Sequence, residues 1–449
     1  MKVETLIGNL PDGWVYSTLG EVCRAGGGDI QTGPFGSQLH KSDYVPVGIP
    51  SVMPQNIGDN RICEDGIARI KPLDANRLTR YCVQPGDIVY SRRGDVEKRA
   101  LVREPESGWL CGTGCLRVRL GKRGPDPRYT SFYLGHPSVR EWIVRHAHGA
   151  TMPNLNTSIL SACPFVVPPP ADQEAIASIL SALDDKIELN RQTNATLEAM
   201  ARALFKDWFV DFGPTRAKAE GRAPYLAPHL WELFPDALDD EDKPLGWEIS
   251  TIGQEVQVIG GSTPSTKEPA FWGGCINWAT PKDLSSLQTP VLLETARTIT
   301  ESGMEKISSG LLPIGSVLLS SRAPIGYLAV SEIPVAINQG FIAMVCQKRL
   351  SNLFVWLWTG ENMEAILQKA NGSTFQEISK SNFRPLPVVI ASNTLHKAFD
   401  SIASPLYIKL AQNEQESRTL AQTRDLLLPK LMSGEIRLRE AERVVEAVL

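Results

Sequence analysis

The stretch Asp172–Phe212, DQEAIASILSALDDKIELNRQTNATLEAMARALFKDWFVDF, decides the fold of this chain. It contains no proline and no glycine, so nothing in it interrupts a helix. At about 1.5 Å per residue the helix would extend roughly 60 Å, which is long for one globular core. The alternative is an amphipathic helix packed on a single domain. A coiled coil is favoured because seam residues recur in alternating steps of four and three: Ile176, Leu180, Leu183, Ile187, Asn190, Asn194, Leu197, Ala201, Leu204 and Trp208.

The composition is that of a soluble protein with more than one domain. At 449 residues the chain is too long for one ordinary core, so we expect two or three domains. It is 42% hydrophobic and 21% charged, and no apolar run reaches the length of a membrane span. The N-terminus lacks the apolar core of a signal peptide, which predicts a cytoplasmic protein. Eight scattered cysteines without a CxxC pair indicate reduced thiols rather than disulfides or a metal site.

Charge is distributed unevenly along the chain. The net charge of −4 argues weakly against a nucleic-acid partner, but residues 1–165 hold 20 Lys and Arg against 16 Asp and Glu. Residues 244–390 hold 10 against 11. The charge of the whole chain therefore does not exclude a local basic cleft.

The chain contains an internal repeat. Pro11-Asp-Gly-Trp14 matches Pro244-Leu-Gly-Trp247 at an offset of 233, and later blocks match in the same order. The offset falls to 223 at Gly149 and Gly372 and then stays constant. This pattern indicates loop insertions within a variable domain, followed by a helix of fixed length.

The long helix therefore has a counterpart near the C-terminus, and two matching seams can bury one another. Asparagines at equivalent places would set the register, and the intervening domain favours antiparallel packing. Pro429 predicts a kink or an end of the second helix. At the offset of 223 the second seam is Phe399, Ala403, Leu406, Leu410, Asn413, Ser417, Leu420, Arg424, Leu427 and Leu431.

The predicted fold class is α+β, with two similar mixed α/β domains separated by two long helices packed as an antiparallel coiled coil. Short β-branched runs bounded by Gly or Pro predict strands at Asp87–Ser91, Leu116–Leu120, Ser316–Ser320 and Gly340–Cys346. Helical spacing recurs in Tyr129–His146 and Leu353–Lys369. The predicted boundaries are 1–168 for the first domain, 169–212 for the first long helix, 213–243 for a linker, 244–391 for the second domain, 392–437 for the second long helix and 438–449 for a C-terminal tail.

The sequence lacks the motifs of familiar catalytic sites. It has no GxxxxGK[ST] phosphate loop, no HExxH array and no Asn/Asp-Pro-Pro-aromatic tetrapeptide of amino-methyltransferases. The nearest approach to a nuclease metal site is formed by Asp87, Asp95, Glu97 and Lys98, whose spacing is unsuitable. We therefore predict no catalytic residue and no metal site.

Polar, non-acidic residues recur instead at the edges of both domains. Lys and Arg suit phosphate contacts, Arg also pairs with guanine, and Gln or Asn pairs with adenine. A single strand-end arginine is more often solvated or ion-paired, but recurrence in both halves favours a binding role. The candidate DNA-binding residues are Gln31, Thr32, Gly36, Ser37, Gln38, Lys41, Ser91, Arg92, Arg93, Arg99, Thr151 and Asn154 in the first half, and Thr263, Ser265, Lys267, Lys282, Ser320, Ser321, Arg322, Thr374 and Gln376 in the second.

Several of these blocks resemble a known family. Ala203–Phe212, ALFKDWFVDF, and the residues that follow it are similar to the central region of type I restriction-modification specificity subunits. Gly260–Gly274 and Gly33–Ser37 resemble their target recognition domains, and Leu426–Ile436 resembles the end of their second helix. The resemblance covers essentially the whole chain.

The resemblance implies a non-catalytic DNA sequence-specificity subunit. Each target recognition domain would read one half of a bipartite target in double-stranded DNA. The helices would set the half-site spacing and dock two methyltransferase subunits, and two restriction subunits join in some complexes. S-adenosylmethionine, ATP and Mg²⁺ would belong to those partners, so no cofactor is expected in this chain. The rival hypotheses are a single-chain DNA methyltransferase or nuclease, and a structural scaffold that never contacts bases.

Overall fold

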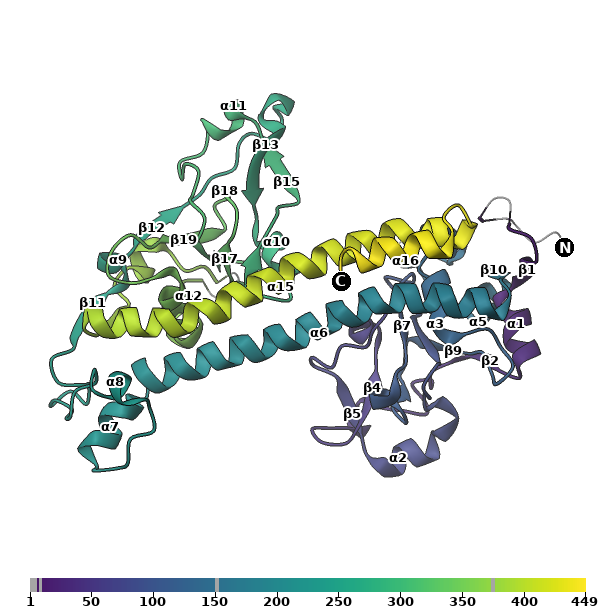
Figure 1. Cartoon of the computed structure of the whole chain (residues 1–449), viewed down its shortest axis with the longest axis horizontal. Coiled ribbons are helices and arrows are strands. Elements are labelled where there is room, and N and C mark those ends of the chain that lie inside the picture. The colour runs from purple at the N-terminus through teal and green to yellow at the C-terminus, as the bar shows by residue number, and fades with distance from the viewer. Residues whose placement is uncertain (1–5, 8–9, 150–152, 373–375) are drawn as a thin grey trace. The chain divides into compact units, whose positions relative to one another are not determined.

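The chain divides into two compact units, and the boundary between them falls inside both long helices. The computed structural model describes residues 6, 7, 10–149, 153–372 and 376–449. The first unit is Met1–Ile187 with Thr419–Leu449, and the second is Glu188–Arg418. Each unit therefore contains one α/β domain, part of the first long helix and part of the second (Figure 1).

In the first unit, two small sheets and five short helices form the domain. Its N- and C-terminal ends are joined by an antiparallel pair, β1 (Val15–Thr18) and β10 (Pro164–Val167). One sheet has the order β2-β9-β6-β7, with β2 Asp29–Thr32, β9 Cys115–Arg119, β6 Ile88–Ser91 and β7 Arg99–Leu101. The other has the order β3-β5-β4-β8, with β3 Tyr44–Val45, β5 Ala68–Ile70, β4 Ile49–Val52 and β8 Leu110–Cys111. The helices are α1 Leu19–Gly26, α2 Pro72–Arg77, α3 Pro127–Tyr133, α4 Pro137–His146 and α5 Thr157–Ala162.

Local sequence signals explain where these helices begin. Thr18 accepts a hydrogen bond from the backbone N–H of Glu21, whose carboxylate accepts in return from the N–H of Thr18, so α1 starts with a capping box. Asp126 caps α3, whose first residue is Pro127. The segment predicted to be helical from Tyr129 to His146 forms two helices because Pro137 starts the second one.

In the second unit, the domain repeats this topology. The closing pair is β11 (Glu248–Thr251) with β20 (Pro387–Ile390). The sheets have the orders β12-β19-β16-β17-β14 and β15-β13-β18, so the shared strands occupy equivalent places, while β14 is added in the second unit and β3 has no counterpart there. The strands are β12 Gln257–Gly260, β19 Phe341–Val345, β16 Val317–Ser321, β17 Ile325–Ser331, β14 Val291–Leu292, β15 Arg297–Ile299, β13 Trp272–Ala279 and β18 Val335–Ile337. The helices are α9 Ile252–Glu255, α10 Pro281–Ser285, α11 Glu301–Met304, α12 Asn352–Glu361, α13 Met363–Gln368 and α14 Lys380–Phe383.

Two long helices run in opposite directions, α6 (Pro170–Phe209) and α15 (Asn393–Ser433). In the first unit, the beginning of α6 packs on the end of α15, with Leu180 and Leu427 in the same buried cluster. In the second unit, the end of α6 packs on the beginning of α15, with Ala201 and Leu410 buried together. The predicted fold class is therefore confirmed, antiparallel helix pair included.

The remaining helices follow the long ones. The linker holds α7 (Gly213–Ala219) and α8 (Pro228–Trp231), and the C-terminal tail holds α16 (Leu438–Glu446). Of the two outcomes predicted at Pro429, an end of the second long helix is wrong, since α15 continues to Ser433, and a kink stays a prediction. Leu431 and Met432 are buried in that last turn, and their packing outweighs the hydrogen bond that proline cannot donate. No described helix is long and apolar enough to cross a membrane.

The middle of the helix seam is polar. Asn190 donates through Nδ2 to the Ser417 hydroxyl at 3.2 Å and to the Asn413 carbonyl at 3.3 Å. Asn413 donates through Nδ2 to the Asn194 side-chain oxygen at 2.9 Å. The bonds from Asn190 to Ser417 and from Asn413 to Asn194 are equivalents in the repeat, because each residue of one lies 223 positions from its counterpart. These buried amides fix the register that the sequence analysis assigned to them.

Candidate nucleic-acid interface

In the first unit, two loops that contain candidate residues both hydrogen-bond to the turn before β9. Because β9 lies between β2 and β6, the turn that leads into β9 touches the loops that follow both neighbours. The Thr113 hydroxyl donates to the Pro34 carbonyl at 3.1 Å, and the Gly114 carbonyl accepts from the backbone N–H of Arg92 at 2.8 Å. The fold thus brings segments together that the sequence could only treat separately.

A strand-end arginine lies against a second segment in both units. Arg93 forms an isolated β-bridge with Asn154, and Arg322 forms the equivalent bridge with Glu377. The Arg322 guanidinium lies 3.8 Å from the Glu377 carboxylate. Two further candidates, Thr151 and Thr374, lie outside the described residues. The repeat therefore places Arg93 and Arg322 alike, and within the described ranges only Arg322 is ion-paired with an acid.

Four candidates are buried and cannot reach DNA in this structure. Ser91 and Ser320 are 1% and 0% exposed, and their hydroxyls donate to the carbonyls of Arg93 and Pro324. Ser321 is also buried. Arg99 is 7% exposed and donates to the Ser131 carbonyl at 2.6 Å, and burial lowers its pKa. Ser91, Ser320 and Arg99 therefore stabilise the loops of their own domains, because their side chains donate hydrogen bonds to backbone carbonyls there.

The side chains of the remaining candidates are of three kinds: hydrogen-bonded within the domain, half-buried or exposed. Gln38 accepts from the Tyr81 hydroxyl at 2.8 Å, and Gln31 accepts from the Arg117 guanidinium at 3.2 Å, so both amides brace the first domain. Thr32, Arg92 and Asn154 are half-buried. The exposed candidates are Gly36, Ser37, Lys41 and Arg93 in the first unit, and Thr263, Ser265, Lys267, Lys282 and Gln376 in the second.

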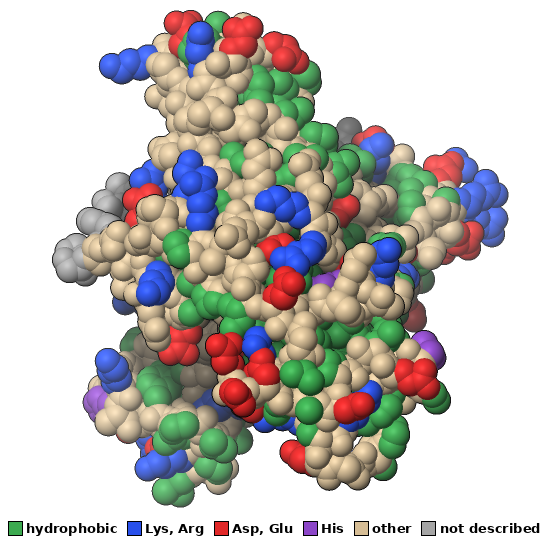
Figure 2. Space-filling view, turned by 90° about the vertical axis from the view of Figure 1, so that its left-hand side faces the viewer, with side chains coloured by type: hydrophobic (Ala, Val, Ile, Leu, Met, Phe, Trp, Pro, Cys, Tyr) green, Lys and Arg blue, Asp and Glu red, His purple; other side chains and the backbone are tan. Residues whose placement is uncertain are grey.

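Charges of both signs are mixed on the surface. On the face shown in Figure 2, Lys and Arg side chains alternate with Asp and Glu, and the coloured side chains form no continuous basic stripe. Strong non-specific DNA binders concentrate positive charge on one face. The face shown in Figure 2 therefore has no concentrated positive charge of the kind that attracts phosphate generally.

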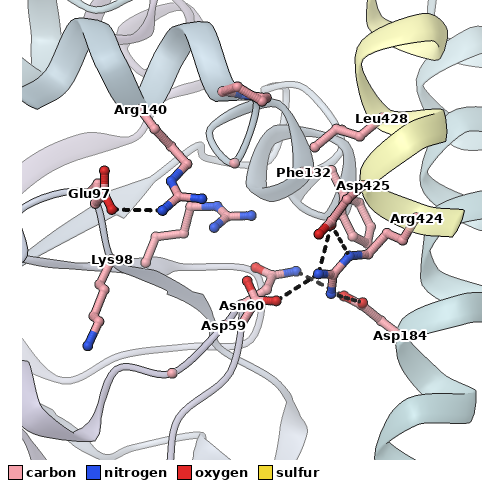
Figure 3. Close-up of a pocket in the computed structure, with 14 residues that line it drawn as sticks. Asp59, Asn60, Glu97, Lys98, Phe132, Arg140, Asp184, Arg424, Asp425 and Leu428 are labelled. Carbon is pink, nitrogen blue, oxygen red and sulfur yellow. Dashed lines mark hydrogen bonds and ion pairs between the residues drawn. The ribbon is translucent and has the colours of Figure 1, made fainter. Parts of the chain in front are cut away.

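A charged network attaches the first domain to the long helices (Figure 3). Arg424 of α15 donates to Asp184 of α6 at 2.7 Å and to Asp59 of the domain at 2.8 Å. Asn60 lies beside them with its amide 3.5 Å from Asp184, and its side-chain oxygen accepts from the Ser131 hydroxyl. One guanidinium thus joins both helices to one loop of the domain.

The network borders an open pocket of about 440 Å³. Arg140 and Glu97, paired at 2.7 Å, form another part of its wall. Burial raises the pKa of the Asp184 carboxyl above its ordinary value, although Arg424 opposes the rise. With acids and bases both present, the pocket wall has no excess of one charge. The residues around the pocket therefore form a structural contact that holds the first domain on the two helices.

The described residues contain no group of three or more His, Cys, Asp or Glu side chains arranged to hold a metal ion. Cys111 and Cys115 lie close in sequence and are both buried as free thiols. Burial raises their pKa values, which keeps them protonated and unreactive.

Residues 11–199 and 244–392 match a family model described as the type I restriction modification DNA specificity domain. The chain belongs to this family. The duplicated architecture is that of a type I specificity subunit, whose two domains serve DNA target recognition.

Known specificity subunits are similar over nearly their whole length. The HindI specificity subunit of Haemophilus influenzae is 25% identical over 438 residues, covering 86% of this chain and 95% of that one. The MjaIX specificity subunit of Methanocaldococcus jannaschii is 24% identical, covering 97% and 96%. The solved type I S subunit from M. genitalium shares the fold, with a TM-score of 0.53, 17% identity and coverage of 96% and 98%.

The structure also reveals positions in this specificity subunit that sequence patterns did not single out. Asp59 is paired with Arg424 across 365 positions of the chain. Arg297 stacks on Trp272 at the edge of the second target recognition domain. Neither belongs to a motif or a periodic pattern. The one available signal was Arg424, the charged residue among the apolar, amide and hydroxyl residues of the seam.

Proposed function

We propose that this chain is the non-catalytic DNA-reading subunit of a type I restriction-modification complex. Each target recognition domain reads one half of a bipartite target, and the helix pair fixes the distance between the halves. The observation that carries the proposal is the pairing of two domains of one topology with two antiparallel helices of matching seams. A duplicated reader on a fixed spacer suits a target with two separated halves.

We further propose that the partners supply the chemistry. Two methyltransferase subunits would dock on the helices and bring S-adenosylmethionine, and two restriction subunits would bring ATP and Mg²⁺. No cofactor is assigned to this chain. Its mixed surface charge supports an arrangement in which much of the affinity for double-stranded DNA comes from the assembled complex.

The spacer can be lengthened without disturbing either unit. Ile187 ends the first unit on α6, and Arg418 ends the second on α15. Inserting one heptad after each of these residues preserves the seam and adds about 10 Å, or roughly three base pairs, by the rise per residue and per base pair. We expect both half-sites to be retained and the preferred gap between them to widen.

The measurement is adenine methylation of a randomised duplex library by the complex of this chain with its methyltransferase subunits. Inserting the heptad into α6 alone is the control, because it shifts the register of the seam without a matched change in α15. An unchanged gap in the doubly extended variant would contradict the spacer role. Binding of S-adenosylmethionine by the purified chain would contradict the non-catalytic role.

A further inference from the structure

The second domain carries an exposed arginine held flat on an aromatic ring. The guanidinium carbon of Arg297 lies 3.5 Å from the ring centroid of Trp272 and 5.6 Å from that of Trp278. The two indoles meet edge to face, with centroids 4.9 Å apart. A carbon at 3.5 Å from a ring centroid is in stacking contact, so the plane of the guanidinium is fixed.

The same two indoles hold the loop that contains three of the exposed candidates of this domain, Thr263, Ser265 and Lys267. Trp272 donates through Nε1 to the Ser265 carbonyl at 3.1 Å, and Trp278 donates to the Ser262 carbonyl at 3.3 Å. The hydroxyl of Thr263 donates to the Gln339 side-chain oxygen at 2.5 Å. Arg297 is therefore separated from this loop by the width of one indole ring. The arginine and the loop form one surface.

The hydrogen-bonding edge of Arg297 is free. Among the described residues, no side chain or carbonyl accepts a hydrogen bond from its guanidinium. Other arginines of the second unit are ion-paired: Arg349 of the domain pairs with Glu248 and Glu255, and Arg418 of α15 pairs with Glu294. Stacking covers the face of the guanidinium and leaves its N–H groups at the rim, where a planar acceptor can meet two of them.

The first domain has no such arginine at the equivalent place. Ile49 pairs with Ile70 in β4 and β5, and Ile276 pairs with Ile299 in β13 and β15, so the two strand pairs have the same register. Two positions further along, Ser51 faces Ala68 in the first domain, whereas Trp278 faces Arg297 in the second. Two domains that read different DNA sequences must differ in some of the residues that contact bases. The two domains differ at the position of Ala68 and Arg297.

We propose that Arg297, held in plane by Trp272, is a specificity-determining residue that reads a guanine in the half-site of the second domain. Two of its N–H groups would donate to O6 and N7 of the base in the major groove, which is the commonest specific contact of arginine. Bidentate phosphate contacts use the same planar fork, but they carry no base information, so their loss would weaken methylation at all sequences alike. Acidic and basic side chains also lie side by side on the lobe that carries α11, at the top of Figure 2, so general phosphate attraction there is weak. The inference rests on the proposed function.

The test compares methylation of a randomised duplex library by complexes containing the wild-type chain, Arg297→Lys or Arg297→Ala. Lysine keeps the charge and loses the planar fork. We expect both variants to lose the preference for one guanine by on the order of tenfold to a hundredfold, with all other positions unchanged. Trp272→Ala should weaken the same preference, and Trp272→Phe, which retains a stacking face, should weaken it less.

Arg349→Lys is the matched control, because it makes the same replacement in the same domain at an arginine bound to Glu248 and Glu255. Its specificity should equal that of the wild type. If Arg297→Ala does not fold, Arg297→Lys still decides the question. Unchanged specificity, or a uniform loss of methylation at all sequences, would overturn the guanine contact and leave the proposed function intact. A wild-type complex without a bipartite preference would instead overturn the proposed function.

Discussion

The two units attach the same kind of domain to the helix pair in different ways. In the first unit, a guanidinium bridges two carboxylates, with Arg424 between Asp184 and Asp59. Counting 223 positions along the repeat, the equivalents of Arg424 and Asp184 are Ala201 and Tyr407, both buried. At these places the guanidinium and the carboxylate have therefore been replaced by an alanine and by a tyrosine, whose hydroxyl donates to the Glu332 carboxylate at 2.8 Å, while the fold of the domain has been kept.

Aromatic rings form much of the attachment in the second unit, in addition to the Arg418–Glu294 ion pair and the Thr289–Glu414 hydrogen bond. Phe399 of α15 has ring centroids at 5.2 Å from Phe209 and 6.0 Å from Trp208, both of α6. Phe354 of the domain lies 4.9 Å from Phe209. Such packing depends on buried area and hardly on ionic strength. The two repeats therefore share the position of the contact between domain and helices, and they differ in the residue types that form it.

The largest effect is expected from the aromatic junction. Phe399 is 0% exposed, so Phe399→Ala leaves a cavity and should destabilise the second unit by about 3–5 kcal/mol. Hydrogen exchange of the full-length chain would detect increased opening of peptides from Glu188–Arg418 and not from the first unit. Ile408→Ala, on the same helix but 53% exposed, is the control and should have little effect. Equal opening of both units would contradict a separate aromatic junction.

A slightly smaller effect is expected from the charged junction. Arg424→Ala leaves the Asp184 carboxylate buried without its partner and should destabilise the first unit by about 2–4 kcal/mol, because the Asp59 end of the network is exposed. Adding Asp184→Asn removes the uncompensated charge and should restore part of the loss. Lys430→Ala tests an exposed lysine of the same helix.

Denaturant unfolding monitored by hydrogen exchange of the first unit measures these changes. The wild-type junction of the first unit should also weaken in high salt, whereas the aromatic packing of the second unit should not, although the Arg418–Glu294 pair of that unit should. A double variant less stable than Arg424→Ala alone would show that the charge of Asp184 is not the cause.

The smallest effect concerns a buried histidine of the second unit. His396 is 4% exposed and accepts a hydrogen bond through Nε2 from the backbone N–H of Ala391 at 3.2 Å, so it must be neutral. Burial, assisted by Arg349, lowers its pKa from 6.5 to about 4. Its equivalent in the first unit is Gln173, which is also buried and accepts from the N–H of Asp126.

A lowered histidine pKa means that the unfolded chain binds the proton more readily. The contribution to stability is complete above a pH of about 6.5 and is lost as the pH falls toward the folded pKa of about 4. Relative to His396→Gln, the wild-type chain should lose about 2 kcal/mol between pH 7 and pH 5. Unfolding free energies of both proteins across this range provide the measurement, and parallel curves would contradict it.

The long helices could be predicted because their information is local and periodic. The seam from Ile176 to Trp208 follows a spacing that only a helix satisfies, and its repetition 223 positions later named the partner. Strands such as β6 and β19 were recognisable as short apolar runs between turn residues. The contacts of Asp59 and Arg297 could not be predicted, because each depends on a pairing between distant segments.

Recurrence in both domains singled out two serines that are buried and not exposed at the surface. Ser91 and Ser320 recur because both domains use a buried hydroxyl to bond the backbone of the same loop. Residues shared by the repeats maintain the architecture. Residues that distinguish the half-sites must be sought where the repeats disagree, as Ala68 and Arg297 do.

The polar middle of the seam has a consequence for how such genes can recombine. The boundary between the units falls between Ile187 and Glu188 on α6, and between Arg418 and Thr419 on α15. A crossover at these places transfers a domain together with the half-helices that bury it, and it keeps the bonded amide and hydroxyl groups of Asn190, Asn194, Asn413 and Ser417 together, because all four lie in the second unit. A crossover at the edges of the domain instead joins one junction chemistry to the other. Inheritance of whole units, half-helices included, is therefore the exchange that leaves every apolar contact with its original neighbours.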